Sequence, residues 1–313
     1  MRAVGIILAG GNNNRMKELT HKRAVAAMPI AGSYRSIDFA LSNMTNSHIQ
    51  KVAVLTQYNA RSLNEHLNSS KWWNFGRKQG GLYVFTPTIT NDNGYWYRGT
   101  ADAIYQNMDF LKKSHEPYVV IASGDAVYKM DYSKVLQYHI DKKADVTVVC
   151  KEMDPSDDVS RFGTIRMDDD MRITEFEEKP MVTKSNMIST GIYVIRRRLL
   201  IDLIEHAAEE ERFDFVNDVL IRYKNLKKIY GYKIDHYWSN IATVDAYYKT
   251  NMDFLKPEVR NYFFKQDPEI YSKVSDLPPA KYNPGASVKN SLVGSGSIIN
   301  GTVENSVIFK QVF

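Results

Sequence analysis

The sequence has little of what several protein classes require. Its 313 residues contain one cysteine, Cys150, so an intrachain disulfide and a cysteine-built zinc site are excluded. No apolar run approaches the roughly 20 residues of a membrane span. The first apolar run is too short and wrongly flanked for a signal peptide. We therefore expect a cytoplasmic protein without a membrane partner, with Cys150 buried in a strand at residues 145–150.

The chain also lacks a long run of charge of one sign. Lys and Arg number 41 against 36 Asp and Glu, and the net charge of +5 is scattered along the sequence. Such a distribution favours anionic small-molecule substrates over nucleic acid. Hydrophobic residues make up 43% and charged residues 25%, so a sizeable core is expected and disorder is not.

Short apolar runs alternate with helical patterns along most of the chain. This alternation predicts an α/β fold, Rossmann-like, with a mostly parallel sheet and helices on both faces. Ligands of such sheets bind at the carboxyl ends of the strands, where Gly10 and Asp125 should meet across one crevice. We expect strands at 4–8, 51–55, 118–122, 145–149, 191–195 and 228–232, and helices at about 35–47, 61–69, 100–114, 132–142 and 197–208.

The pattern changes near residue 277, where two proline-containing segments suggest a boundary. We divide the chain into domains 1–276 and 277–313. The second shows a six-residue periodicity of small and aliphatic residues, which predicts a parallel β-helix; the alternative is a glycine-rich tail with one hairpin. One coil takes about 18 residues, so residues 286–313 hold little more than one. The β-helix is then either truncated or docked onto another subunit.

The segment Leu8–Arg15, LAGGNNNR, has the features of a phosphate-binding turn. It follows an apolar strand, and Gly10 and Gly11 would let backbone N–H groups approach a phosphate. Three asparagines occupy the middle of the turn, where more glycine is expected. Arg15 adds a positive charge just downstream. The turn therefore has the pattern of a nucleotide site, but asparagines stand where some of its conformationally permissive glycines are expected.

Two further segments carry candidate nucleotide and metal contacts. Asp125 follows the strand at 118–122, where a carboxylate would hold Mg²⁺ against phosphate oxygens or, alternatively, cap the next helix. Tyr97, with Trp96, precedes Gly99 and Thr100 at the start of a helix. The aromatic rings would stack on a base and Thr100 would be the N-cap; the plainer alternative is an ordinary cap with core aromatics.

Two later segments carry a candidate sugar-phosphate contact and a candidate metal position. Lys179 follows two glutamates and precedes a proline, so its ammonium would contact a sugar phosphate or belong to a solvated turn. Asn240 lies in an aromatic-then-polar segment, HYWSNIAT, at residues 236–243. An aspartate there would be a second metal ligand, whereas the neutral amide of asparagine binds Mg²⁺ much more weakly.

These segments together resemble the glucose-1-phosphate adenylyltransferase (ADP-glucose pyrophosphorylase) family of bacterial glycogen synthesis. The resemblance covers nearly the whole chain and keeps the family's order of motifs. The most specific pieces are GSYRSIDFALSN at 32–43, LTQY at 55–58, YRGTADA at 97–103, GD at 124–125 with YKMDY at 128–132, and FEEKP at 176–180. It implies a nucleotidyltransferase α/β domain followed by a left-handed β-helix.

The resemblance also implies a chemistry. Members form ADP-glucose and pyrophosphate from ATP and glucose 1-phosphate, use Mg²⁺, work as tetramers and respond to small metabolites. Carried over by motif, Asp125 is a metal ligand and Arg15 a triphosphate contact. The implied nucleotide-binding residues are Leu8, Ala9, Gly10, Gly11, Gln57, Tyr97, Gly99, Thr100 and Ala101. The implied sugar-phosphate-binding residues are Glu178, Lys179, Ser189 and Asp214.

The departures from the family pattern gather around the triphosphate and the metal. Asn13 replaces a glycine of the loop, and Val25 stands where the family has a phosphate-contacting lysine. Asn240 stands where the family has its second metal-binding aspartate, so metal binding is in doubt. Each such loss removes stabilisation of charge in the transition state. The positions implied for the sugar phosphate are retained.

We therefore expect a regulatory, non-catalytic subunit of the type found beside a catalytic one in some Gram-positive bacteria. It would join a catalytic paralogue in a hetero-tetramer and keep a pocket for glucose 1-phosphate, ATP or a small effector. The alternative is an active sugar-1-phosphate nucleotidyltransferase with altered metal use or nucleotide choice, supported by Asp125 and Lys179. A third possibility is a scaffold that binds no ligand.

Overall fold

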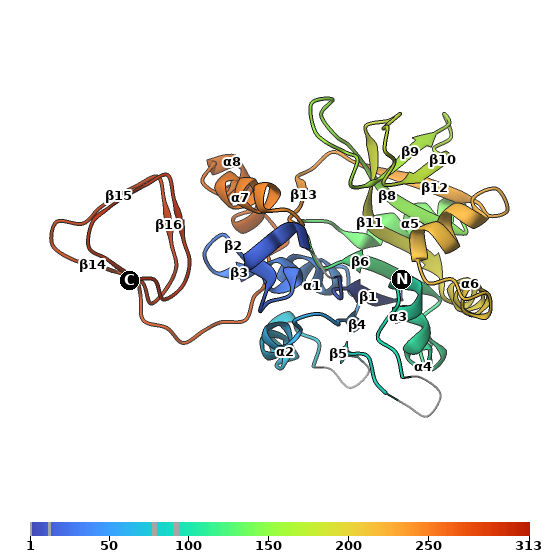
Figure 1. Ribbon diagram of the computed structural model, residues 1–313, viewed down its shortest axis with the longest axis horizontal. Helices are drawn as coiled ribbons and strands as arrows, with labels where there is room; N and C mark the ends of the chain where they lie inside the picture. Colours follow the sequence, from blue (N-terminus) through green and yellow to red (C-terminus); the bar gives the residue numbers. More distant parts are fainter. Residues whose placement is uncertain (1, 12–13, 77–79, 90–93) are drawn as a thin grey trace.

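A central sheet organises the computed structural model, which describes residues 2–11, 14–76, 80–89 and 94–313 (Figure 1). Within these residues the sheet has nine strands. They are β1 (Ala3–Leu8), β4 (Lys51–Leu55), β5 (Gly81–Phe85), β6 (Tyr118–Ser123), β8 (Val146–Glu152), β9 (Gly163–Met167), β10 (Ile173–Glu178), β11 (Met187–Arg196) and β12 (Ile229–Ile234). The six predicted strands all form, and Cys150 is buried in β8 as expected.

The sheet is mixed, with a parallel half and an antiparallel insertion. Its order is β10-β9-β11-β6-β1-β4-β5, and β8 lies between β11 and β12. β1 pairs in parallel with β4 and β6, as β8 does with β12, whereas β11 is antiparallel to both β6 and β8. No crossover helix precedes β11, and a parallel strand needs one, so β11 reverses direction. The prediction of a mostly parallel sheet is confirmed, with this insertion as the addition.

Eight α-helices in the described residues surround the sheet. They are α1 (Ser36–Asn46), α2 (Arg61–Leu67), α3 (Thr100–Gln106), α4 (Met108–Lys112), α5 (Tyr132–Asp141), α6 (Arg197–Glu209), α7 (Val244–Asp253) and α8 (Pro257–Phe264). Short helical segments are η1 (Asn14–Thr20), η2 (Val25–Ala27), η3 (Ser70–Trp73) and the π-helical η4 (Phe215–Ile221). The predicted helix at 100–114 divides at Asn107, whose amide donates 2.9 Å hydrogen bonds to the Ala103 carbonyl and the Tyr97 hydroxyl. Among the described residues, no helix is both long and apolar enough to traverse a membrane.

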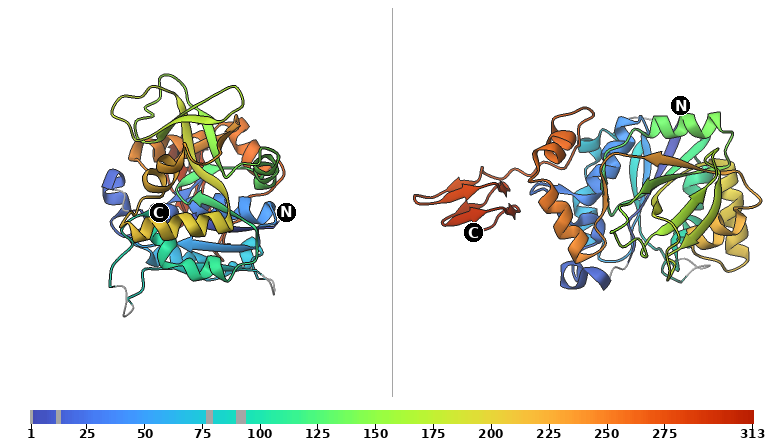
Figure 2. Two further views of the ribbon diagram at one scale, coloured as in Figure 1. Left: turned by 90° about the vertical axis from the view of Figure 1, so that its right-hand side faces the viewer. Right: turned by 90° about the horizontal axis from the view of Figure 1, so that it is seen from above.

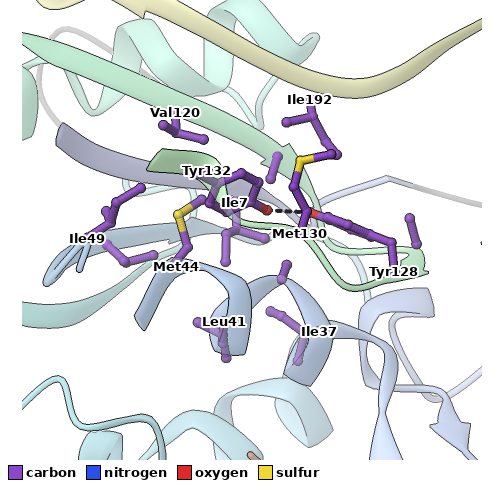
Figure 3. Packing of buried hydrophobic residues seen from close by; sticks show 14 of the residues in the cluster. Ile7, Ile37, Leu41, Met44, Ile49, Val120, Tyr128, Met130, Tyr132 and Ile192 are labelled. Carbon is purple, nitrogen blue, oxygen red and sulfur yellow. Dashed lines mark hydrogen bonds between the residues drawn. The ribbon is translucent and has the colours of Figure 1, made fainter. Parts of the chain in front are cut away.

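Both faces of the sheet are buried under helices. In β1, Ala3 and Ile7 pack into one core cluster, while Val4 and Ile6 pack into the other. This alternation follows from the two-residue period of a strand. The first cluster includes apolar residues of α1 and α5, and Figure 3 shows α1 side chains such as Leu41 and Met44 packing beneath the sheet. The second cluster includes residues of α3, α4 and α6.

A small two-stranded sheet extends from the edge of the cavity described below. β7 (Ala126–Tyr128) pairs with β13 (Trp238–Asn240) in antiparallel orientation. Lys129, directly after β7, is buried, and its ammonium donates to the carbonyl oxygens of Tyr262 (2.8 Å) and Gln266. The Tyr262 hydroxyl donates back to the Lys129 carbonyl at 3.0 Å. These bonds join the end of β7 to the end of α8.

The C-terminal segment stands beside the main body as a separate stack of short strands (Figure 2). β14 (Lys281–Tyr282) pairs with β17 (Ile298–Ile299), β15 (Ser287–Lys289) with β18 (Thr302–Glu304), and β16 (Leu292–Val293) with β19 (Val307–Ile308). All three pairs are parallel, as in a β-helix, so the alternative of a single hairpin is wrong.

This stack is attached to the main body by an irregular segment. Residues 265–280 form no helix or strand. The stack approaches the turn between β2 (Pro29–Ile30) and β3 (Tyr34–Arg35), where a Cβ on Gly32 would lie 3.6 Å from the Ile308 carbonyl. The domain division at residue 277 stays a prediction.

Candidate functional site

A cavity of about 770 Å³ opens at the carboxyl ends of β1, β4 and β6. This is the crevice expected for a parallel α/β sheet, and Gly10 and Asp125 both line it. The predicted site residues that line the cavity are Leu8, Ala9, Gly10, Gly11, Arg15, Val25, Gln57, Tyr97, Gly99, Thr100, Asp125, Lys179 and Asn240. The predicted residues that do not line it are Ala101, Glu178, Ser189 and Asp214. Asn13 lies outside the described residues.

The turn after β1 is held by the neighbouring strands. The backbone N–H of Ala9 donates to the Leu55 carbonyl at 2.8 Å, and the N–H of Gly124 donates to the Leu8 carbonyl at 2.9 Å. A Cβ on Gly10 would lie 3.3 Å from the Gln57 Cβ, whereas one on Gly11 would meet open space. Gly10 therefore allows the turn to lie close to the segment after β4.

Asp125 faces the cavity from the segment between β6 and β7. Its carboxylate accepts a short hydrogen bond from the Ser123 hydroxyl. The alternative that Asp125 caps the next helix is wrong, because β7 follows it. The cap of α5 is Asp131, which accepts from the Ser133 N–H at 2.9 Å.

Asn240 lies next to Asp125 because β13 pairs with β7. Asn240 is opposite Ala126, and the N–H of Ile241 donates to the Asp125 carbonyl at 2.9 Å. The side-chain oxygen of Asn240 accepts from the Ala242 N–H at 3.0 Å. The amide oxygen is thus already hydrogen-bonded to the backbone.

The segment around α3 is fixed by contacts with the fold. The Gln57 amide donates to the Tyr97 carbonyl at 3.3 Å, and the Thr100 hydroxyl accepts from the Phe215 N–H at 2.9 Å. Gly99, and not Thr100, occupies the N-cap of α3, so the expected Thr100 cap is wrong. A Cβ on Gly99 would lie 2.3 Å from the Phe213 carbonyl oxygen, so only glycine permits this approach.

The residues implied for the sugar phosphate are divided between the cavity and its surroundings. Lys179 has a left-handed backbone (φ 48°), and its ammonium forms a 2.8 Å ion pair with Glu178. The Ser189 hydroxyl lies 3.2 Å from the hydroxyl of Tyr193, which itself lines the cavity. Asp214 accepts from the Asn217 N–H at 2.7 Å and caps η4.

The sequence prediction missed Arg161, which lines the cavity from the segment between β8 and β9. Burial lowers the pKa of its guanidinium, and the carboxylates of Asp125 and Asp158 oppose that shift. Arginine stays charged under such shifts. The only sequence signal was a basic residue beside an aromatic one before a strand, which is too common to single out.

Comparison with known proteins agrees with this geometry. The nucleotidyl transferase family pattern matches residues 4–257. The chain is 42% identical over 313 residues to a glucose-1-phosphate adenylyltransferase of Clostridium botulinum. That alignment covers 99% of this chain and 81% of the relative. The enzymes of the same name from Clostridium novyi and Thermosipho melanesiensis are 40% and 39% identical over 312 and 311 residues. These alignments cover 99% of this chain and 81% and 75% of the two relatives. The chain belongs to the glucose-1-phosphate adenylyltransferase family.

The substrates of the glucose-1-phosphate adenylyltransferase family are ATP and glucose 1-phosphate, and nucleotidyl transferases typically use Mg²⁺. In this cavity the candidate metal ligands are Asp125 and Asn240. Asp125 supplies one carboxylate, while Asn240 supplies a neutral amide whose oxygen already bonds the Ala242 N–H. The guanidinium of Arg161 faces the same space. One carboxylate beside a neutral amide and a cation does not fit a tightly held divalent metal.

Proposed function

We propose that this chain is a subunit of a glucose-1-phosphate adenylyltransferase with little or no turnover of its own. It would join a catalytic paralogue in a hetero-tetramer and change the partner's activity or its response to a small metabolite. The observation that carries the proposal is the pair Val25 and Asn240. Both line the cavity, and both lack the charge that the family's lysine and aspartate would bring.

The size of the missing interactions supports a loss of chemistry. Phosphoryl transfer depends on positioning and on neutralising the charge that develops on the phosphate. One preorganised interaction of this kind is commonly worth about 3–4 kcal/mol, or roughly 10²–10³ in rate. Losing a lysine and a metal ligand together should leave very little turnover, although such effects do not add.

The rest of the cavity supports continued ligand binding. Arg15, Gln57, Tyr97, Thr100 and Lys179 all line the same space of about 770 Å³. A cavity of this size and lining is suited to a nucleotide or a sugar phosphate. A retained pocket would let the subunit report the presence of a family substrate or effector to its partner.

The test begins with the purified chain alone. It is assayed with ATP, glucose 1-phosphate and Mg²⁺ for release of pyrophosphate, and little or none is expected. Turnover near ordinary enzyme rates of about 1–10³ s⁻¹ would overturn the loss of catalysis. The chain is then added to the catalytic paralogue of the same organism, and co-purification with changed activity or effector response is expected. No change would overturn the regulatory role.

A second candidate is an active nucleotidyltransferase with altered metal use or nucleotide choice. It is favoured by Asp125, Arg15 and Lys179, which lie in one cavity. The double substitution Val25→Lys with Asn240→Asp separates the two candidates. A chain that has lost its catalytic charges should gain activity, whereas an enzyme adapted to a different reaction should not. A scaffold without a ligand would bind neither ATP nor glucose 1-phosphate in calorimetry.

A further inference from the structure

We propose that Arg161 takes the place of the divalent cation beside Asp125, so that this cavity binds the phosphates of ATP without a metal ion. The inference rests on the proposed function, because it explains how a site that has lost its second metal ligand still holds a nucleotide. It concerns binding to this chain, whereas the proposed function concerns turnover and the effect on a partner.

The position of Arg161 is the first support. It lies in the segment 153–162 between β8 and β9, far in the sequence from Asp125 and Asn240. The fold brings all three side chains to the lining of one cavity. A permanently charged cation therefore lies in the same cavity as Asp125 and the neutral Asn240.

The surroundings of Arg161 hold it there. Its guanidinium lies 4.6 Å from the centre of the Phe162 ring, and that ring packs edge-on at 5.6 Å against Trp238. Trp238 begins β13, the strand that ends at Asn240. The Lys179 N–H donates to the Phe162 carbonyl at 3.2 Å, which anchors the same segment beside the cavity. Arg161 is thus connected through Phe162 to the strand that carries the substituted metal position.

The guanidinium retains hydrogen-bonding capacity for a ligand. Among the described residues its one side-chain hydrogen bond is long, 3.5 Å to the Thr243 hydroxyl. Asp125 and Asp158 act on it electrostatically without forming a close ion pair within the described part of the chain. A guanidinium offers five N–H donors in a planar fork that matches two phosphate oxygens.

The charges also balance. Two carboxylates with one divalent cation carry no net charge, and one carboxylate with one guanidinium carries none either. With Asn240 neutral, the charges of Asp125 and Arg161 balance each other in this cavity without a metal. The phosphates of ATP would then meet a fixed monovalent cation instead of an exchangeable divalent one.

The experiment is calorimetric titration of the full chain with ATP, once with EDTA and once with Mg²⁺. Wild-type chain is expected to bind ATP in EDTA with a Kd within about threefold of that in Mg²⁺. Arg161→Gln should weaken binding in EDTA by about tenfold to a hundredfold, the usual range for one charged hydrogen-bond partner. Arg161→Lys, which keeps the charge and loses the fork, should recover part of the loss.

The matched control is Arg166→Gln. Arg166 lies on β9 outside the cavity, in an exposed ion pair with Glu175, so its loss should leave ATP binding unchanged. Thermal unfolding of each variant shows whether it folds. Equal ATP affinity of Arg161→Gln and Arg166→Gln, absence of ATP binding by the wild type, or binding that requires Mg²⁺ would each overturn the inference.

A second variant tests the charge balance without touching Arg161. Asn240→Asp returns the second carboxylate and should weaken ATP binding in EDTA, with Mg²⁺ restoring it by at least tenfold. Binding of ATP by Asn240→Asp that is the same with and without Mg²⁺ would contradict the charge argument. If Arg161 proves irrelevant to ATP while the chain still alters its partner, the proposed function stands alone. Ordinary turnover by the pure chain would overturn the proposed function whatever Arg161 does.

Discussion

Two groups of residues line the same cavity and differ in how the fold depends on them. The braced group, Gln57, Tyr97, Gly99 and Thr100, is tied to the polypeptide by its own backbone and side chains. Of the substituted group, Val25 and Asn240, Val25 packs in a buried apolar cluster while bordering the cavity, and the Asn240 side chain bonds the Ala242 N–H two residues away. An aspartate at position 240 would accept the same bond from the Ala242 N–H that Asn240 accepts.

The difference explains how catalytic charges are lost while the fold and the pocket persist. A substitution in the braced group breaks a contact within the protein and therefore lowers the free energy of unfolding. A substitution at position 240 that keeps the bond to Ala242, or one at position 25 that extends into the cavity, changes mainly what the cavity offers to a ligand. Loss of chemistry at these two positions therefore carries little structural penalty.

The largest effect is expected from restoring both charges of the substituted group. Val25→Lys with Asn240→Asp should raise ADP-glucose synthesis by at least about 10²-fold, since single interactions of this type are worth 10²–10³. Pyrophosphate release in the presence of ATP, glucose 1-phosphate and Mg²⁺ measures it. The control pair, Val25→Met with Asn240→Gln, keeps both positions uncharged and should stay inactive. An unchanged rate in the restored variant would favour the second candidate, an enzyme adapted to a different reaction.

A smaller effect, on stability, is expected in the braced group at Gly99. Gly99→Ala forces a Cβ to within 2.3 Å of the Phe213 carbonyl oxygen, which belongs to backbone and has little freedom to move. We expect a loss of about 2–3 kcal/mol in the free energy of unfolding, at the upper end of overpacking effects. Urea unfolding measures it, with Gly11→Ala, which meets open space, as the control. Equal stability of the two variants would contradict the close approach.

Thr100→Val should have a more modest effect in the same group. Valine keeps the shape of threonine but removes the oxygen that accepts from the Phe215 N–H at 2.9 Å. Leaving that N–H without its partner should cost about 1–2 kcal/mol of unfolding free energy. Thr100→Ser, which keeps the hydroxyl, is the control in chemical denaturation. A loss as large in Thr100→Ser would show that the methyl group and not the hydrogen bond matters.

The smallest effect is expected from Val25→Lys alone. The side chain of Val25 is only 7% exposed but borders the cavity, so a lysine can extend its ammonium into that space. The unfolding free energy should fall by about 1 kcal/mol, because the apolar contacts of Val25 are only partly replaced by the stem of the lysine. Ala27→Lys, at a fully buried residue of the same segment that does not line the cavity, is the contrast and should be far more destabilising. Similar losses in both variants would contradict the expectation that a lysine at position 25 reaches the cavity.

The fold was largely predictable because its signals are local. Each predicted strand is a short apolar run, and each predicted helix carries a periodic apolar face. The antiparallel direction of β11 was not predictable, since it depends on the absence of a crossover helix between β10 and β11. The division of one predicted helix at Asn107 was also missed. It depends on bonds to Ala103 and Tyr97 that a periodicity does not reveal.

The candidate site was predictable where its residues follow strands. Gly10, Gln57 and Asp125 come directly after β1, β4 and β6, and neighbouring parallel strands end at one edge. Arg161 was not predictable in this way, because its segment reaches the cavity through long-range packing on Trp238. Ser189 and Asp214 came from motif matching, which carries a role but not a position, and neither lines the cavity.

The buried ammonium of Lys129 has a mechanical consequence. It clamps two carbonyl groups at the end of α8 and sits four residues after Asp125. Beyond α8 the chain leads through residues 265–280 to the C-terminal stack. A pull or twist applied to α8 through that tether must either break these bonds in a buried place or shift β7 with them. Movement of α8 is therefore coupled through Lys129 to β7, the strand that directly follows the cavity residue Asp125.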